Sequence, residues 1–181
     1  MAMSLNSKYK KEIEILKRGG VGVMPTDTIY GLVGSAFSKK AVRRIYKIKK
    51  RNKNKKLIVL ISSVKDLEKF KIKVDAKTKE MLNKFWPGKV SIVIYDIAFR
   101  LPRSKFLVEI LKKTGPLVAP SANPENFRHA ENIKEAKAYF GDQVDFYSSK
   151  GSLKGKSSIL IRINKNGETE VLRGIIKKHG K

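Results

Sequence analysis

The chain of 181 residues has a formal net charge of +25, no cysteine and 41% hydrophobic residues. This length and apolar content are typical of one folded domain, expected here over residues 1–181, and they exclude an intrinsically disordered chain. Without cysteine there is no disulfide or thiolate metal site, and two isolated histidines cannot build a zinc centre, so we predict no protein-held metal. No apolar run approaches the roughly 20 residues that span a bilayer, and the N-terminus lacks a signal-peptide pattern, so we expect a cytoplasmic protein.

The net charge of +25 leaves two interpretations open. A charge of this size attracts polyanions, which makes tRNA or double-stranded RNA a candidate partner. Lysine is also spread along the whole chain, so the charge is equally consistent with a lysine-rich background that binds nothing in particular. The densest cluster, KIKKRNKNKK at residues 47–56, considered alone is a solvated face or a generic phosphate patch.

Hydrophobic periodicity and capping residues predict alternating helices and strands in the first half of the chain. In order, we expect a helix at 6–18 stopped by Gly19, a strand at 21–25, a helix from Ser38 to Lys49, a strand at 57–61, and helical stretches at 64–70 and 76–85. Pro25 should end the pairing of the first strand, because proline has no amide proton to donate.

The second half is richer in strands. We expect strands at 90–94 and 97–101, a helix at 104–113, a strand at 116–120, a helix at 132–140, and strands at 144–147, 157–163 and 168–173, with a hairpin turn at Asn166-Gly167. Helices interleaved with strands and hairpins predict an α/β domain on a twisted mixed β-sheet flanked by helices.

A polar loop, PTDTIYGL at residues 25–32, follows the first strand. Its hydroxyls and carboxylate stand at the end of a strand, where open α/β sheets bind ligands. Proline, aspartate and glycine are also common turn residues, and Thr26 would then only satisfy local backbone donors. The loop alone favours a turn, so a functional interpretation depends on the other motifs.

Two short polar pairs flank the middle of the chain. Lys49 and Arg51 come at the end of a predicted helix, where the helix dipole is a sufficient structural reason for their charge. Ser121 and Asn123 follow an apolar run, where capping of a turn is their commonest use. Arginine offers a fixed fork of donors and lysine a mobile point charge, and together they suit a triphosphate.

Two further features have competing interpretations. Arg100 lies in the apolar strand IAFRLP, where a guanidinium is costly unless it reaches an anion or, on an outward-facing edge strand, solvent. The segment GSLKGKSS at 151–158 resembles a P-loop, but it is one residue short between its glycines and precedes a strand-like run. A P-loop must open a helix, so we reject this segment as one.

Taken in order, these motifs resemble the YrdC-type threonylcarbamoyl-adenylate synthases in their single-domain form. The matching pieces run from GGVGVMPTDTIYGL through KIKKR, LIVLI, RLPR and PLVAPSAN to SSILIRI and VLRG, over residues 19–174. The resemblance implies a YrdC-like domain with a concave basic cavity. It implies a nucleotidyltransferase that converts L-threonine, bicarbonate or CO2, and ATP, with Mg2+, into threonylcarbamoyl-adenylate and pyrophosphate. The product would feed N6-threonylcarbamoyladenosine (t6A) modification of tRNA by partner transferase proteins.

The resemblance also assigns site residues by position. The L-threonine positions are occupied by Thr28, Arg100 and Ser157, and the nucleotide positions by Lys49, Arg51, Ser121, Asn123 and Arg173. Lys49 and Arg51 fall on the ATP phosphates and are the catalytic candidates. No metal ligand is predicted.

The chain departs from the family's pattern in several places. RNKNKKL lacks both of the usual prolines, SANPENF lacks the usual Ser-Gly, VLRGIIKK lacks the usual Pro-Gly, and Leu60 replaces a frequent histidine. An alternative of another class therefore stays open. The chain would then be a non-catalytic module of the same fold that holds tRNA or double-stranded RNA by its phosphates.

Overall fold

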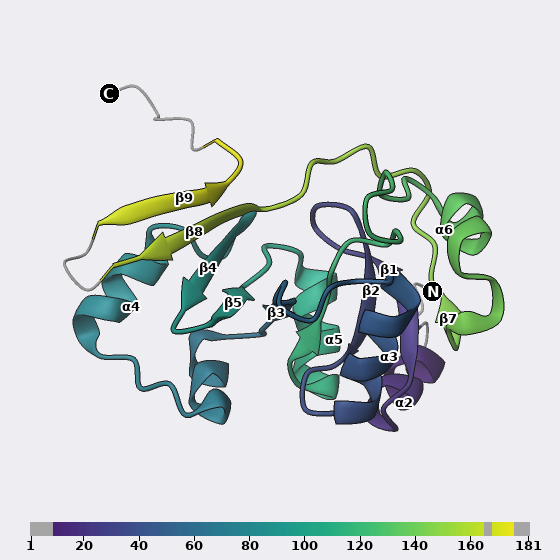
Figure 1. Cartoon of the computed structure of the whole chain (residues 1–181). Coiled ribbons are helices and arrows are strands. Elements are labelled where there is room, and N and C mark those ends of the chain that lie inside the picture. The colour runs from purple at the N-terminus through teal and green to yellow at the C-terminus, as the bar shows by residue number, and fades with distance from the viewer. Residues whose placement is uncertain (1–8, 165–167, 176–181) are drawn as a thin grey trace.

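The predicted alternation of helices and strands is present in the computed structural model, which describes residues 9–164 and 168–175 (Figure 1). The first half contains α2 (Lys10–Lys17), β1 (Val21–Pro25), β2 (Tyr30–Ser35), α3 (Lys39–Lys49), β3 (Ile58–Leu60), the 3-10 helix η1 (Val64–Phe70) and α4 (Ala76–Asn83). The second half contains β4 (Val90–Ile94), β5 (Ile97–Arg100), α5 (Lys105–Thr114), β6 (Leu117–Val118), α6 (Ile133–Phe140), the 3-10 helix η2 (Gly141–Gln143), β7 (Phe146–Tyr147), β8 (Ile159–Ile163) and β9 (Thr169–Arg173).

The strands form one sheet in the order β7-β1-β2-β6-β3-β5-β4-β8-β9. Pairing is mixed as predicted: β1 is antiparallel to β2 and parallel to β7, while β5 is parallel to β3 and antiparallel to β4. β5 is therefore an inner strand. In Figure 1 the β8–β9 end of this twisted sheet stands apart from the end covered by α2, α3 and α5.

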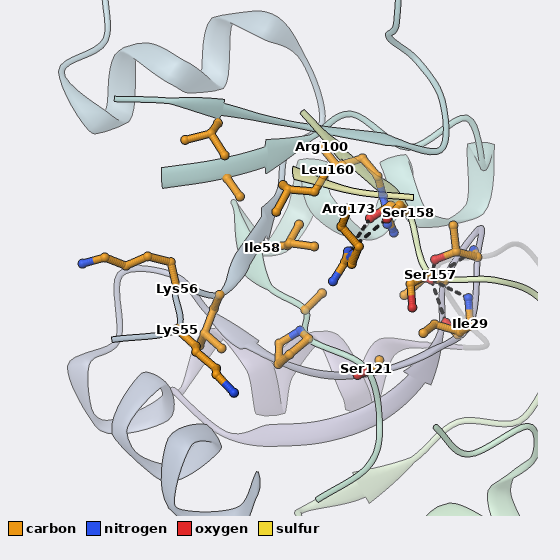
Figure 2. A pocket seen from close by; sticks show the side chains of 18 of the residues that line it. Ile29, Lys55, Lys56, Ile58, Arg100, Ser121, Ser157, Ser158, Leu160 and Arg173 are labelled. Atoms are coloured by element: carbon orange, nitrogen blue, oxygen red, sulfur yellow. Dashed lines mark hydrogen bonds between the residues drawn. The ribbon is translucent and has the colours of Figure 1, made fainter. Parts of the chain in front are cut away.

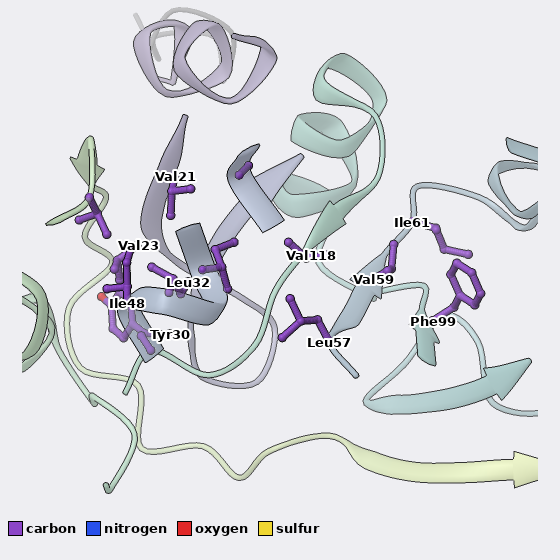
Figure 3. Packing of buried hydrophobic residues seen from close by; sticks show 14 of the residues in the cluster. Val21, Val23, Tyr30, Leu32, Ile48, Leu57, Val59, Ile61, Phe99 and Val118 are labelled. Atoms are coloured by element: carbon purple, nitrogen blue, oxygen red, sulfur yellow. The ribbon is translucent and has the colours of Figure 1, made fainter. Parts of the chain in front are cut away.

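Alternating side chains along the strands separate the interior into two clusters, one on each face of the sheet. Val23, Leu32, Val59 and Val118 belong to the larger cluster (Figure 3), which also includes buried residues of α3, η1, α4 and α6. The residue adjacent to each of them in the chain points to the opposite face, where α2 and α5 cover Met24, Val33, Leu60 and Leu117. Leu60 is thus a core residue of the second cluster.

Most predicted helix boundaries are confirmed, because the capping side chains act as expected. Ser38, Ser104 and Asn132 each accept a hydrogen bond from a backbone amide three residues along the chain. Gly19 and Gly115 stand just beyond helices at positive φ, a conformation that glycine adopts without a steric penalty. The stretch 64–70 is a 3-10 helix. No helix among the described residues is long and apolar enough to cross a membrane.

One strand goes beyond the sequence prediction, and one predicted hairpin is confirmed in its pairing. The strand β2 was not predicted, because Gly31 and Gly34 interrupt its apolar pattern. A Cβ at Gly34 would lie 3.1 Å from the Cβ of Ala41, so this glycine allows α3 to pack closely on the sheet. The hairpin of β8 and β9 is confirmed by their antiparallel pairing, although its predicted turn at 166–167 lies outside the described residues.

Candidate functional site

A pocket of about 350 Å³ lies over the part of the sheet formed by β3, β5, β4 and β8. Its floor includes Ile58, Ala98 and Val93, which register with one another across β3, β5 and β4. Arg100, two residues after Ala98, and Leu160, two residues before the partner of Val93, lie on the same face. They share the face of the sheet that α2 and α5 cover farther along, beyond β3. The pocket therefore occupies the stretch of this face that these two helices leave open.

The hairpin that joins β1 to β2 forms one wall of the pocket. Thr26 Oγ1 donates to the carbonyl of Ile29 at 2.7 Å and accepts from the amide of Thr28 at 3.2 Å. The turn interpretation is thus confirmed for Thr26, yet Thr26 and the buried Thr28 also line the pocket. The two threonine hydroxyls lie 3.0 Å apart, so the turn holds both in place.

Arg100 forms a buried ion pair with Asp27 of the β1–β2 hairpin. It is 4% exposed at the end of the inner strand β5, and its Nη2 donates to Asp27 Oδ1 at 2.9 Å. The edge-strand interpretation is wrong, because β5 lies between β3 and β4. Burial lowers the pKa of Arg100, Asp27 opposes that effect, and Arg173 adds to it. Arg100 Nε and Asp27 Oδ2 are buried without a hydrogen-bond partner in the described part of the chain, which leaves capacity for a ligand.

Arg173 reaches the pocket because of an irregularity in the β8–β9 pairing. Ile161 pairs with Val171, but Leu160 pairs with Arg173, so Leu172 is an extra residue in β9. Such a bulge moves the following side chains to the other face of the sheet. Arg173 consequently shares the pocket face with Leu160, and its Nη2 donates to the carbonyl of Ser158 at 3.0 Å (Figure 2). Burial and then the charge of Arg51 lower the pKa of Arg173.

Arg51 lines the pocket from the loop that follows α3. Lys50 has φ of 50° and ends the helix, so the chain turns sharply before Arg51. The Arg51 guanidinium donates from Nε to the carbonyl of Lys55 at 3.0 Å and from Nη2 to that of Lys56 at 3.2 Å. Its position is therefore set by the loop that it begins.

Lys49 lies behind the pocket. It is 1% exposed, and its Nζ donates to the carbonyl of Ser121 at 2.6 Å and to that of Asn123. Burial and the charge of Arg51 lower its pKa to about 7. Lys49 thus ties the end of α3 to the loop after β6, and Ser121 from that loop lines the pocket.

The segment between β7 and β8 forms another wall, which lies against the β1–β2 hairpin. Tyr30 fastens it, since its hydroxyl donates to the carbonyl of Gly151 at 2.7 Å and accepts from the amide of Lys150 at 2.9 Å. A Cβ at Gly155 would lie 1.9 Å from the carbonyl oxygen of Thr28, so only glycine allows this approach. The segment leads into β8 without a helix, in agreement with its rejection as a P-loop.

The structure brings together most of the predicted site. Residues from both predicted groups line the pocket, namely Thr28, Arg51, Arg100, Ser121, Ser157 and Arg173. Lys49 and Asn123 are not part of the lining, so phosphate or nucleotide contacts by them stay predictions. The sequence placed the Asp27 carboxylate in a polar loop but did not predict its pairing with Arg100 or that of Lys55 with Glu125, because an ion-pair partner distant in the chain gives no local signal.

Comparison with known proteins identifies the family. The sequence model for Sua5, YciO and YrdC proteins, described as "Telomere recombination", matches residues 14–174. A threonylcarbamoyl-AMP synthase of Hahella chejuensis is 30% identical over 163 residues, covering 82% of this chain and 88% of the relative. A putative threonylcarbamoyl-AMP synthase of Methanocaldococcus jannaschii is 28% identical over 184 residues, covering 92% and 87%.

Solved structures show the same fold. Pyrococcus abyssi Sua5 complexed with L-threonine matches with a TM-score of 0.82 at 23% identity, over 93% of this chain and 54% of that one. The chain thus spans about half the length of that protein. Escherichia coli YciO matches with a TM-score of 0.80 at 22% identity, over 93% and 89%. On the extent of the sequence match, the chain belongs to the Sua5/YciO/YrdC family.

Proposed function

We propose that this protein is a threonylcarbamoyl-AMP synthase, which makes threonylcarbamoyl-adenylate and pyrophosphate from L-threonine, bicarbonate or CO2, and ATP. One observation carries the proposal beyond family membership. Arg51 from the loop after α3, Arg100 from β5 and Arg173 from β9 line one pocket together with serine and threonine hydroxyls. Such a set suits a small polar molecule beside a polyphosphate.

The threonine end of the pocket is assigned to Thr28, Arg100 and Ser157. The unpartnered Nε of Arg100 is a buried donor that the carboxylate of an amino acid would satisfy. Thr28 and Ser157 supply hydroxyls on the two walls that meet near Gly155. We therefore place the amino acid between the β1–β2 hairpin and the segment that leads to β8.

The phosphate end is assigned to Arg51 and Arg173, with Ser121 beside the nucleotide. The amine of threonine adds to CO2 and loses a proton, which gives a carbamate. A carbamate oxygen then attacks the α-phosphorus of ATP, and the bond to the bridging oxygen breaks as pyrophosphate leaves. Charge builds on the phosphoryl oxygens and on the leaving group, where fixed guanidinium donors stabilise it. Lys49 supports this end by holding the carbonyls of Ser121 and Asn123.

Mg2+ is expected to accompany ATP and to neutralise phosphate charge. Within residues 9–164 and 168–175 there is no group of three or more His, Cys, Asp or Glu that would hold a metal ion. Asp96 does contribute a carboxylate to the pocket lining. This arrangement fits an ion that phosphate oxygens and water would hold, with Asp96 as a carboxylate of the pocket lining and not as part of a protein metal site.

The product would serve t6A modification of tRNA in the cytoplasm, through partner transferase proteins. The alternative, an RNA-binding module without catalysis, is favoured only by the net charge of +25. Salt dependence bears on this charge: tRNA affinity driven by phosphate contacts falls steeply between low and physiological salt. If tRNA binding did not depend on salt, or did not occur at low salt, the net charge would reflect only the lysine-rich composition of the chain.

Incubation with ATP, labelled bicarbonate and each amino acid in turn tests the proposed reaction. We expect a labelled adenylate and pyrophosphate with threonine and no comparable product with the other amino acids. Pyrophosphate release that depends on neither threonine nor bicarbonate would contradict the proposal, and so would the absence of any product.

A further inference from the structure

Two loops at the phosphate end of the pocket contact each other, and the side chain of Glu125 makes the contact. Its Oε1 lies 2.7 Å from Lys55 Nζ, and its Oε2 accepts from the amide of Asn52 at 3.0 Å. The Glu125 side chain is 15% exposed, whereas that of Lys55 is 58% exposed. The carboxylate is therefore the sheltered member of this ion pair.

The loop that Glu125 holds in turn orients Arg51. The amide of Lys55 donates to the carbonyl of Asn52 at 3.0 Å, which closes a turn over residues 52–55. The carbonyls of Lys55 and Lys56 then accept from the Arg51 guanidinium. No proline fixes the backbone of RNKNKKL, so hydrogen bonds hold the loop's conformation. Besides those named, the amide of Asn54 donates to Asn52 Oδ1 at 2.9 Å and the hydroxyl of Tyr46 donates to the carbonyl of Lys55 at 3.3 Å. A chain of direct contacts thus runs from Glu125 through the turn to Arg51.

The backbone of Glu125 is anchored independently of its side chain. Its amide donates to the carbonyl of Lys49 at 2.7 Å, at the end of α3. Lys49 Nζ in turn donates to the carbonyls of Ser121 and Asn123, which precede Glu125 on the same loop. Removal of the Glu125 carboxylate leaves these bonds in place. A variant should therefore fold and lose only the contact between the two loops.

We propose that Glu125 is a positioning residue, which clamps the 52–55 turn so that Arg51 faces the phosphates of the nucleotide. The assignment of phosphates to this end rests on the proposed function. The clamp is ionic at neutral pH, because Lys55 and the amide of Asn52 hold the pKa of Glu125 below its usual value. Glu125 itself touches no substrate in this arrangement and acts through Arg51.

The test uses inorganic pyrophosphate as a probe, since its binding needs no turnover. Calorimetric affinity would be measured for the wild type, Glu125→Ala and Glu125→Gln, together with amide hydrogen exchange over residues 51–57. Two controls match these changes. Glu109→Gln breaks a surface pair of the same 2.7 Å length, with Lys112 on α5, and Lys53→Ala removes an exposed charge from the same loop.

We expect Glu125→Ala to weaken pyrophosphate binding about tenfold, as the loss of a charge-assisted hydrogen bond does, and to speed exchange at 52–55. Glu125→Gln should fall between it and the wild type, because the amide oxygen still accepts from Asn52. Both controls should stay close to the wild type. In steady-state assays, the KM for ATP should rise while the KM for threonine stays unchanged.

Unchanged pyrophosphate affinity and exchange in Glu125→Ala would overturn the clamp. An equal loss of protection from amide exchange in residues 51–57 and in the distant segment 148–158 would overturn it too, because it would indicate a general loosening of the protein. The proposed function can fail separately. A wild-type protein that makes no adenylate refutes the reaction, whereas the binding and exchange data still decide whether Glu125 positions Arg51.

Discussion

The arginines at the two ends of the pocket differ in how their charge is paired. Arg100 is buried on an inner strand and paired with Asp27 at 2.9 Å. Arg51 and Arg173 form no ion pair with any described carboxylate, and their guanidinium groups donate to backbone carbonyls instead. Burial and like charge lower the pKa of Arg173, as expected for cations that face each other without an acid between them. One end is thus nearly balanced in charge, and the other has an excess of positive charge.

This difference matches the two proposed ligands. An amino acid brings one carboxylate, for which a single paired arginine with a spare donor suffices, whereas a triphosphate brings several negative charges. The ends also differ in how they are built. Arg100 is held by sheet pairing to β3 and β4, whereas Arg51 is held by a loop whose contacts include one exposed ion pair. Sheet pairing on both sides holds the arginine of the threonine end, whereas loop contacts hold the arginine that begins the phosphate end.

The largest expected effect is at the phosphate end, with Arg51→Lys. A lysine keeps the charge but cannot reproduce the fork that bonds to the Lys55 and Lys56 carbonyls. Loss of a fixed donor to a developing anion costs about 100- to 1000-fold in rate. Threonine-dependent pyrophosphate release would show this loss, while Lys53→Ala in the same loop keeps its activity. A near-normal rate in Arg51→Lys would show that the basic cluster at residues 47–56 is only a solvated surface.

At the threonine end, Thr28→Val and Arg100→Ala should raise the KM for threonine. A buried polar group left without its partner typically costs about 1–3 kcal/mol, which corresponds to a roughly ten- to hundredfold increase in this KM. ATP binding should stay largely intact, because neither residue is assigned to the nucleotide. Calorimetric titration with each substrate separately would check this selectivity. Equal losses of ATP and threonine binding would remove the distinction between the two ends.

The wall that closes the threonine end is tested by Gly155→Ala. The new methyl group would stand 1.9 Å from the Thr28 carbonyl oxygen, so the wall must shift. Overpacking of this kind costs about 1–3 kcal/mol, and we expect a lower melting temperature together with a higher KM for threonine. Ser152→Ala, an exposed change in the same segment, is the matched control. A threonine KM equal to that of the wild type would show that the segment does not shape this end.

A pH-dependent effect on stability, rather than on substrate binding, tests the buried anchor of the phosphate end. The pKa of Lys49 is about 7 in the folded protein and near 10.5 without burial, so the folded state binds fewer protons than the unfolded state between these values. The free energy of unfolding of the wild type should therefore rise with pH in this window relative to Lys49→Met. The slope is at most about 1.4 kcal/mol per pH unit. Urea unfolding at several pH values measures it, and parallel pH profiles would contradict the lowered pKa.

Helix and strand positions were largely predictable, since local signals set them. Ser38, Ser104 and Asn132 cap helices as expected, and the apolar runs became strands. The strand β2 escaped detection because Gly31 and Gly34 removed its pattern. Local propensity carries no information about close packing of α3 on that strand, which is what the glycines permit.

The site was predictable only in part, and Lys49 and Arg51 show why. The Lys-x-Arg spacing predicted phosphate contacts by both residues, and the left-handed turn at Lys50 leaves Lys49 buried and Arg51 in the pocket, so a phosphate contact by Lys49 stays a prediction. The orientation of Arg173 depends on a bulge, and a bulge depends on how two strands register rather than on either sequence alone. Asp27 and Glu125 act through partners that lie about 70 residues away in the chain.

The pattern of product inhibition tests most directly whether the two ends hold two different substrates. Initial rates of adenylate formation by the wild-type protein would be measured against ATP and against threonine, at several fixed concentrations of pyrophosphate. Because pyrophosphate would occupy the end with Arg51 and Arg173, we predict inhibition that is competitive against ATP and not competitive against threonine. Competitive inhibition against threonine would place both ligands at the same end and contradict the account.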